Sequence, residues 1–318
     1  MPNSKLTYYK DIESRKVEWL WYPYIPFGKI TIVQGDPGEG KTTFILSLLS
    51  ILSNGEKLPC SDHRISGKAI YQNTEDDNAD TIKPRFENHG ANCGNICFID
   101  KQDGLYLEDD ELKDSAIRSG AKVLVLDPIQ AFIGENTDMN RANAVRPRMN
   151  KLKEIAENTG CAIILVGHLN KNSGGKASYR GLGSIDFSAA ARSILLIGRA
   201  PDNGDIRIVA HQKSNLAPIG TSLEFTLNDG KVEWLGESDI SAEDLMAGNS
   251  PDKANSKIDE ATAVLTSYLA NGPKPYHEIM ELAKTERISE RTMLRAKTGL
   301  GVISNKSRNE WYWSLPDE

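Results

Sequence analysis

A single stretch decides the fold class of this chain. Residues 29 to 43 read Lys-Ile-Thr-Ile-Val-Gln-Gly-Asp-Pro-Gly-Glu-Gly-Lys-Thr-Thr. The first six residues are rich in β-branched side chains and predict a buried strand, and the apolar run after Thr42 predicts a helix to about Ser53. The glycines between them permit a tight loop, so the stretch predicts a strand, a phosphate-binding loop and a helix in that order.

The loop contains every residue type that phosphate binding requires. Its glycines let successive backbone amides point at phosphate oxygens, and the helix that follows adds the positive end of its dipole. We expect Lys41 to reach the β- and γ-phosphates of ATP and Thr42 to bind Mg²⁺ through its hydroxyl. The expected nucleotide-binding residues are Gly35, Asp36, Pro37, Gly38, Glu39, Gly40, Lys41, Thr42 and Thr43.

Two other expected strands end in carboxylates. The apolar run 122–126 leads into Asp127, an arrangement that puts a carboxylate beside the Mg²⁺ at the neighbouring loop. The run that starts at Tyr71 leads into Glu75, which we expect to be the general base for the attacking water. Asp76 and Asp77 are the alternatives for that role, although acidic residues at these positions also favour the start of a helix.

A histidine follows a third expected strand. The run 162–166 is continued by Gly167 and His168. A polar side chain at this position can hydrogen-bond the γ-phosphate and report its loss, so His168 is the candidate γ-phosphate sensor. An ordinary exposed histidine is the alternative.

Further apolar runs extend the strand pattern through the first two thirds of the chain. They alternate with helical periodicity, as in residues 140–158, which predicts an α/β fold whose mainly parallel sheet has helices on both faces. The short strands expected besides the loop strand are 69–72, 96–99, 123–126, 162–166 and 193–197.

The pattern changes after Arg199. Three alternating segments, 205–211, 222–227 and 231–235, predict antiparallel strands added to one edge of the sheet. We therefore expect an ATPase domain over residues 1–236. Residues 237–257 are small and polar without an apolar period, which is typical of a linker.

Residues 258–318 have the element order of a small α+β winged helix-turn-helix domain. Helical periodicity covers 258–270, 276–284 and 289–299, and a β-hairpin of 302–304 and 310–314 with a basic turn at 305–308 follows. Between Arg287 and Arg308 there are six basic residues and one acidic residue. This local excess predicts duplex DNA binding, whereas a protein-binding helical bundle is the alternative. The expected DNA contacts here are Arg291, Arg295, Lys297, Lys306 and Arg308.

Composition excludes several classes of protein. With 39% apolar and 26% charged residues the chain is neither disordered nor fibrous, and four scattered cysteines do not form a disulfide framework. No run approaches the roughly 20 apolar residues of a membrane span, and the first residues lack the apolar core of a signal peptide. We therefore expect a cytoplasmic protein with no membrane partner.

The order of the motifs resembles the RecA-like ATPases of the RepA type, the plasmid and phage replication group related to hexameric DnaB-like helicases. The resemblance covers roughly residues 15–235 and is carried by the stretch 19–28 before the loop, then Glu75, Asp127, His168 and the segment 213–218. It implies a RecA-like core, a catalytic glutamate, a metal-side aspartate and a late-strand histidine at those three residues. It also implies a ring of identical subunits, a hexamer in the related helicases.

In those helicases a Lys-x-Arg pair reaches the γ-phosphate of the neighbouring subunit. Lys213 matches the lysine, but Asn215 stands where the arginine would be, so only half of the pair is present. The resemblance therefore implies a trans-acting Lys213. A surface lysine at a sheet edge is the alternative, and Arg180 and Arg199 are the next candidates for a finger.

A glycine-rich basic loop follows His168. In a RecA-like ring this loop faces the central channel, where cations follow phosphates and an aromatic ring stacks on a base. A solvated loop is the alternative. The expected single-stranded DNA contacts are Lys171, Lys176, Tyr179 and Arg180.

Three functions fit this sequence. The first is an ATP-driven DNA motor or loader of the replicative helicase type. The second is a recombination or repair ATPase that remodels DNA, and the third is an ATP-switched DNA-binding regulator. Replication or recombination proteins are the expected partners besides DNA.

Overall fold

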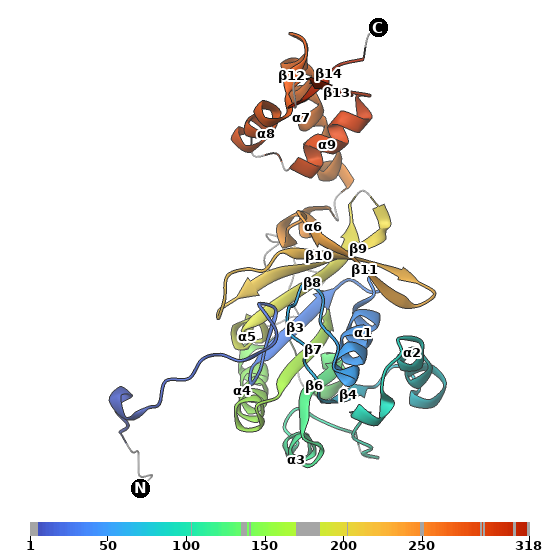
Figure 1. The fold of residues 1–318 in the computed structure, drawn as a ribbon. Helices are drawn as coiled ribbons and strands as arrows, with labels where there is room; N and C mark the ends of the chain where they lie inside the picture. Colours follow the sequence, from blue (N-terminus) through green and yellow to red (C-terminus); the bar gives the residue numbers. More distant parts are fainter. Residues whose placement is uncertain are drawn as a thin grey trace.

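Figure 1 shows the computed structural model of the chain. The structure describes residues 6–102, 104–134, 139, 141–169, 185–201, 203–248, 251–286, 288, 290–307 and 310–316. Among these residues no helix is long and apolar enough to cross a membrane.

A mixed nine-stranded sheet forms the centre of the molecule, in the order β11-β10-β9-β8-β3-β7-β6-β4-β5. The six strands from β8 to β5 in that order run parallel, and the other three are antiparallel additions at the β8 side. The parallel strands are β3 (Ile30–Gly35), β4 (Lys68–Asn73), β5 (Ile96–Cys97), β6 (Ala121–Asp127), β7 (Ala162–His168) and β8 (Ser193–Ala200). The antiparallel strands are β9 (Asn203–Ser214), β10 (Ser222–Asn228) and β11 (Lys231–Ser238).

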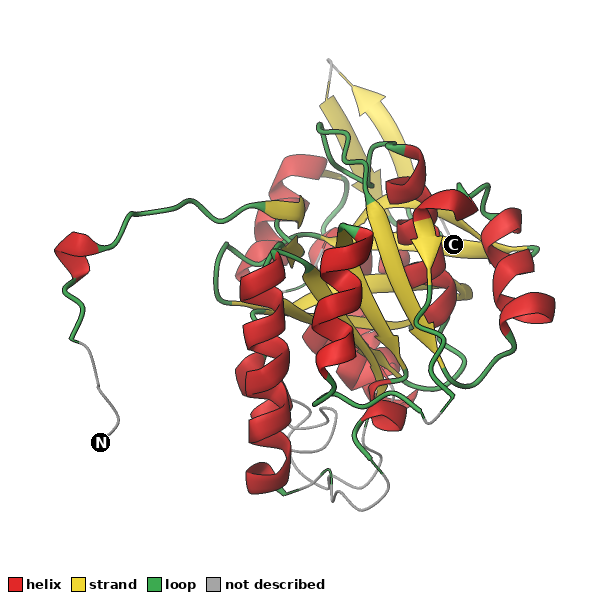
Figure 2. Ribbon diagram, turned by 90° about the horizontal axis from the view of Figure 1, so that it is seen from below, coloured by secondary structure: helices red, strands yellow, loops and turns green. Residues whose placement is uncertain are grey.

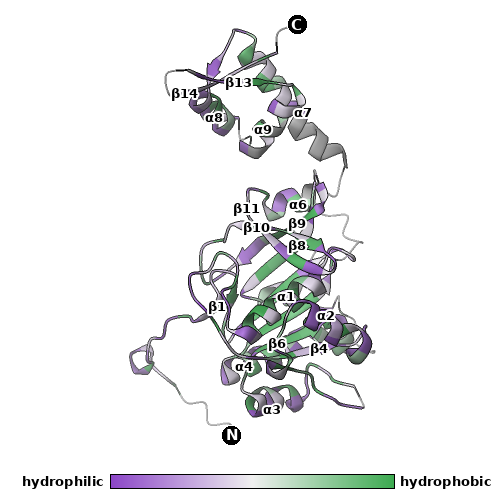
Figure 3. Cartoon of the chain, turned by 45° about the vertical axis from the view of Figure 1, so that its right-hand side comes forward, coloured by the Kyte–Doolittle hydropathy of each residue, from purple (hydrophilic) through white to green (hydrophobic). Residues whose placement is uncertain are grey.

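Helices cover both faces of this sheet, because alternate residues of its strands are apolar on each side. The helix α1 (Lys41–Asn54) and α2 (Lys83–Asn88) pack on one face, with the small antiparallel pair β1 (Trp19–Trp21) and β2 (Ile25–Pro26). The other face is covered by α3 (Asp110–Ser119), α4 (Ala142–Thr159) and α5 (Ile185–Ala190). Figure 2 shows the helices around the sheet, and the apolar strands between them are green in Figure 3.

The expected α/β architecture is confirmed, with a large and mostly parallel sheet that fits a P-loop core. The antiparallel edge expected after Arg199 is confirmed as well. One strand is shorter than expected, since β5 ends at Cys97 rather than at Ile99.

The segment 237–257 differs from the linker that its composition predicts. It contains α6 (Ala242–Gly248) and the first turns of α7 (Pro251–Leu269). Leu245 and Met246 of α6 are buried against β8 and β9. Two adjacent apolar residues are too few to produce a helical period, which is why the sequence pattern did not show this helix.

The C-terminal residues have their own core. Three helices and a three-stranded sheet of order β12-β14-β13 enclose Leu265, Met293 and Trp313 among other apolar side chains. The elements are α7, β12 (Lys274–Pro275), α8 (Tyr276–Thr285), α9 (Glu290–Gly299), β13 (Ile303–Ser307) and β14 (Glu310–Ser314). The strand β13 is longer than expected, because it also includes residues 305–307 of the predicted turn.

Candidate functional site

The phosphate-binding loop lies between β3 and α1, where two glycines are required by geometry. A Cβ on Gly35 would lie 2.2 Å from the carbonyl oxygen of Ile197 on the neighbouring strand β8. Gly40 precedes α1 with a φ of 88°, in the left-handed region that only glycine adopts freely. The backbone therefore passes close to β8 and then turns sharply so that α1 begins at Lys41.

Lys41 points back into this loop. Its ammonium donates a hydrogen bond to the carbonyl oxygen of Asp36 at 2.7 Å, and only 5% of the residue is exposed. Burial lowers the pKa of Lys41, whereas the nearby carboxylates of Asp127, Asp36, Glu39 and Glu75 act in the opposite direction. The loop thus holds a cation with few solvent contacts, suited to the phosphates of a nucleotide.

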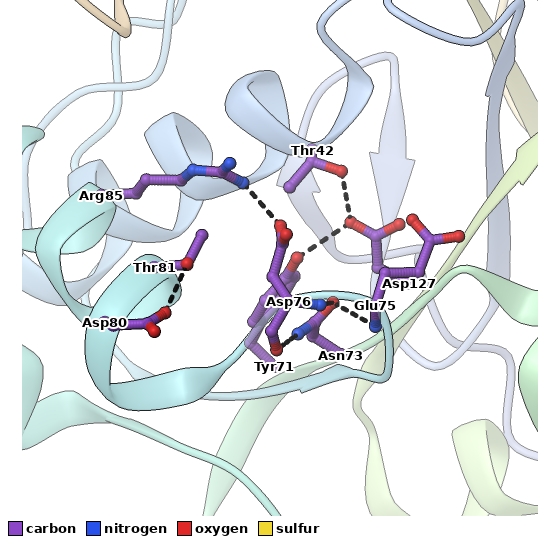
Figure 4. Close-up of polar contacts among 9 residues, drawn as sticks. All are labelled: Thr42, Tyr71, Asn73, Glu75, Asp76, Asp80, Thr81, Arg85 and Asp127. Atoms are coloured by element: carbon purple, nitrogen blue, oxygen red, sulfur yellow. Dashed lines mark hydrogen bonds and ion pairs between the residues drawn. The ribbon is translucent and has the colours of Figure 1, made fainter.

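Thr42 and Asp127 meet at the adjacent end of β6. The Thr42 hydroxyl donates to Oδ2 of Asp127 at 2.8 Å, and the Tyr71 hydroxyl of β4 donates to the same oxygen at 2.9 Å (Figure 4). Asp127 is 5% exposed, and burial raises the pKa of its carboxyl while the two hydrogen bonds lower it. Two hydroxyls therefore fix the orientation of this buried carboxylate.

Three acidic residues follow β4, and the structure distinguishes them. Asp76 forms an ion pair with Arg85 at 2.7 Å. Asp77 accepts hydrogen bonds from the amides of Ala79 and Asp80, at the start of the short helical turn η2 (Asn78–Ile82). These amides lower the pKa of Asp77.

Glu75 has a different environment. It is exposed, and Figure 4 shows its carboxylate beside that of Asp127. Within the described part of the chain, no hydrogen bond or ion pair engages the Glu75 carboxylate. Its negative charge acts to raise the pKa of Lys41 and the pKa of His168. Of the three candidates for a general base, only Glu75 is both near the loop and without another structural role.

His168 ends β7 beside the loop, opposite Gly35 in the parallel register of β3 and β7. Burial lowers the pKa of His168, as does Lys41, while Glu75 and Asp127 raise it. Its Nδ1 atom is buried and has no hydrogen-bond partner among the described residues. The His168 ring therefore lies beside the loop, and one of its buried nitrogens is not hydrogen-bonded by any described residue.

The carboxyl ends of β3, β4, β6 and β7 thus bring together Lys41, Thr42, Glu75, Asp127 and His168, as the sequence predicts for the edge of a parallel sheet. Oxygens of Thr42 and Asp127 are hard ligands that suit Mg²⁺. No group of three or more His, Cys, Asp or Glu side chains in the described ranges could hold a metal. A magnesium ion here would need phosphate oxygens as further ligands, as it does in nucleotide sites.

A sequence model of the AAA domain family matches residues 7–174, which include β3, the loop, Glu75, Asp127 and His168. The chain belongs to the AAA domain family. It is accordingly a P-loop ATPase that binds nucleotide. No curated protein matched the sequence.

The nucleotide site has two contacts that sequence reasoning missed. One is the hydrogen bond from the Tyr71 hydroxyl to Asp127, which was missed because a tyrosine inside an apolar strand is ordinarily a packing residue. The other is an ion pair across the loop, in which Nε of Arg199 on β8 lies 3.5 Å from Oε1 of Glu39. No sequence signal indicated the Tyr71 contact, because it depends on β4 lying beside β6, where Asn73 pairs with Asp127 in the sheet register.

Lys213 lies on β9 and has partners within its own chain. Its ammonium donates to the carbonyl oxygens of Ser188 at 2.5 Å and Ala191 at 2.9 Å, at the end of α5. Burial lowers the pKa of Lys213, and the nearby Arg192 lowers it further. In the single chain this lysine therefore caps a helix.

The expected DNA contacts are described only in part. Lys171, Lys176, Tyr179, Arg180 and Arg308 lie outside the described residues, and Arg291 and Arg295 lie on α9 with side chains that are not described. Lys297 and Lys306 are described. Each stacks on a tryptophan, with Nζ of Lys297 4.7 Å from the Trp313 ring and Nζ of Lys306 5.9 Å from the Trp311 ring.

Proposed function

We propose that this AAA domain protein is an ATP-driven DNA motor or loader of the replicative helicase type that works as a ring of identical subunits. The convergence of Lys41, Thr42, Glu75, Asp127 and His168 at one sheet edge carries the ATPase part of the proposal. The DNA part is supported by the C-terminal order of helices and hairpin and by the basic residues of α9.

In the proposed reaction the residues of the site have different roles. Lys41 offsets the negative charge that develops on the β- and γ-phosphates. Glu75 accepts a proton from the attacking water, and His168 hydrogen-bonds the γ-phosphate and responds when it leaves. Thr42 and Asp127 would hold Mg²⁺, which neutralises charge on the phosphate oxygens.

Two variants with one matched control test this assignment. Lys41→Ala should abolish hydrolysis. Glu75→Gln should retain ATP binding while turnover falls by about 10²- to 10⁴-fold, the range for loss of a general base. Asp77→Asn makes the same chemical change two residues away and preserves an acceptor for the helix-start amides, so it should hydrolyse ATP normally. Unimpaired turnover in Glu75→Gln would move the role to Asp76 or Asp77.

We further propose that Lys213 leaves the α5 carbonyls when subunits assemble and then faces the phosphates held by the neighbouring subunit. A cation supplied in trans stabilises charge on the transferred phosphoryl group and makes hydrolysis depend on assembly. Mixing inactive Lys41→Ala with inactive Lys213→Ala subunits should then restore part of the activity. A Lys213→Ala protein that assembles and hydrolyses ATP normally would contradict this role.

The C-terminal residues 258–318 are proposed to form a winged helix-turn-helix domain that binds duplex DNA through α9 and the hairpin. A double charge reversal at Arg291 and Arg295 should remove duplex binding, and binding should weaken as salt rises because counterions are released. If residues 258–318 show no affinity for duplex DNA even at low salt, a protein-binding role for these helices is favoured.

An ATP-switched DNA-binding regulator is the second candidate. The observation that favours it is the capping role of Lys213 together with Asn215 in place of the second finger residue. Electron microscopy and an ATPase assay with and without single-stranded DNA separate the two functions. A ring with DNA-stimulated turnover supports the motor, whereas turnover independent of DNA supports the switch.

A further inference from the structure

The C-terminal hairpin exposes one tryptophan on a face that otherwise packs inward. In the register of β13 and β14, Lys306 lies opposite Trp311 and Ser304 lies opposite Trp313. Opposed residues of an antiparallel pair share a face, and so do residues two apart in one strand. Trp313 is 3% exposed in the domain core, whereas Trp311, nearer the hairpin turn, is 51% exposed.

Cations accompany both indoles on this face. The Lys306 ammonium lies 5.9 Å from the centroid of the Trp311 ring, and the Lys297 ammonium in the last turn of α9 lies 4.7 Å from that of Trp313. An ammonium is attracted to the negative face of an aromatic ring. Both indoles therefore have a positive charge beside them.

The acidic residue of the hairpin lies on the opposite face. Glu310 precedes Trp311 in β14, so its side chain points the other way, and it pairs with Nδ1 of His277 at 2.5 Å. The Tyr312 hydroxyl donates to the same carboxylate at 3.3 Å. Among the described residues of the hairpin, the face that contains Trp311 therefore has a lysine and no acidic side chain, and Glu310 points toward α8.

A single exposed apolar residue is normal on a protein surface and needs no explanation. An exposed indole beside an ammonium is more specific, because it offers a stacking surface and a phosphate contact together. Bases within a duplex are paired and already stack on their neighbours, so an unpaired base is the one on which an exposed indole can stack most readily.

We propose that Trp311 and Lys306 form a binding site for an unpaired base of single-stranded DNA next to a duplex. The indole stacks on the base, and the Lys306 ammonium contacts the adjoining phosphate. This inference rests on the proposed DNA binding of the same residues and adds a preference for tailed over blunt duplex.

The test compares the affinity of the full chain for a blunt duplex and for the same duplex with a single-stranded tail, by fluorescence anisotropy at low salt without nucleotide. Trp311→Ala should weaken binding of the tailed duplex by about 5- to 150-fold, which corresponds to the loss of one base–aromatic stack. Binding of the blunt duplex should stay within about twofold. Trp311→Phe should restore most of the preference because an aromatic ring remains.

The matched control is Ile303→Ala. Ile303 is another exposed apolar residue of this hairpin, opposite Ser314 and therefore on the other face. Ile303→Ala should leave the affinities for the tailed and the blunt duplex unchanged. Quenching of tryptophan fluorescence by the tailed duplex, present in the wild type and reduced in Trp311→Phe, gives a second readout of stacking.

Three outcomes overturn the inference, and they differ in whether the proposed DNA binding is contradicted as well. Equal losses on both duplexes in Trp311→Ala would make the indole a general contact. No loss on either would remove Trp311 from the DNA surface and favour a protein partner there. A wild-type chain that binds neither duplex at low salt would overturn both this inference and the proposed DNA binding.

Discussion

Tyr71 is the residue whose removal most directly tests how the metal-side carboxylate is held. Its hydroxyl donates to Oδ2 of Asp127 at 2.9 Å, and the phenol ring packs edge-on against Phe86 with centroids 5.7 Å apart. Burial, reinforced by the Asp127 charge, raises the pKa of Tyr71, so the phenol keeps its proton and acts as the donor. Tyr71→Phe deletes this hydrogen bond and preserves the ring.

The size of the effect of Tyr71→Phe depends on how deeply Tyr71 and Asp127 are buried. Tyr71 is 2% exposed and Asp127 is 5% exposed, so water does not replace the lost donor. A hydrogen bond to a charged group contributes about 1.5–3 kcal/mol to stability. Loss of a residue that orients a metal ligand typically weakens metal affinity by about 10- to 100-fold. We therefore expect both a lower free energy of unfolding and a higher Mg²⁺ requirement.

Two measurements check this expectation. Urea denaturation without nucleotide gives the stability change, and ATPase rates over a Mg²⁺ titration at fixed ATP give the metal requirement. Tyr24→Phe is the matched control, because Tyr24 is also buried but donates its hydroxyl to a neutral carbonyl, that of Thr221, at 2.6 Å. It should lose about 0.5–1.5 kcal/mol of stability and keep the wild-type Mg²⁺ dependence. An unchanged Mg²⁺ requirement in Tyr71→Phe would refute a role for this hydroxyl in orienting Asp127.

Three further changes test residues on other strands of the nine-stranded sheet. Burial lowers the pKa of His211 from its ordinary 6.5 to about 4, so the unfolded chain takes up its proton first as pH falls. The free energy of unfolding should therefore drop by about 1.4 kcal/mol per pH unit between those pKa values in urea titrations, and His211→Gln should remove that contribution to the slope. Gly35→Ala should prevent soluble expression or lower the thermal midpoint sharply, because its Cβ would overlap the Ile197 carbonyl; a normal melting curve would show that β8 can move aside. Arg199→Ala leaves the Glu39 carboxylate unpaired in the phosphate loop and should weaken ATP binding in calorimetry, whereas unchanged affinity would make the ion pair incidental.

Much of the nucleotide site could be predicted because its residues sit at the ends of strands. The sequence runs before Gly35, Asp127 and His168 are apolar and short, so each marks a strand, and parallel strands end at a common edge. Backbone pattern alone therefore brings these residues together. The preference for Glu75 over Asp77 required more, since adjacent acidic residues look alike until one of them is seen to accept two helix-start amides.

What the sequence could not predict depends on pairings between distant segments. Tyr71 contacts Asp127 because β4 and β6 are neighbours in register, and Arg199 reaches Glu39 because β8 adjoins β3. Strand order in a parallel sheet is set by crossover connections, and nothing in a short apolar run specifies its neighbour. The helix α6 was missed for a different reason, since its two buried residues form no period.

Lys213 shows where resemblance and structure give different information about one residue. The motif order implies a side chain that acts on a neighbouring subunit, whereas in the single chain its ammonium satisfies two carbonyls at the end of α5. These roles exclude each other at any one moment, because the same ammonium cannot both cap α5 and contact a phosphate across an interface. If both occur, assembly must expose the end of α5, and the burial that lowers the Lys213 pKa must be offset by the phosphate charge it gains. Assembly and the order of α5 would then be coupled through one lysine, so hydrogen exchange at the α5 amides should be faster in the assembled protein than in the single chain, and equal exchange in the two states would show that Lys213 keeps its cap.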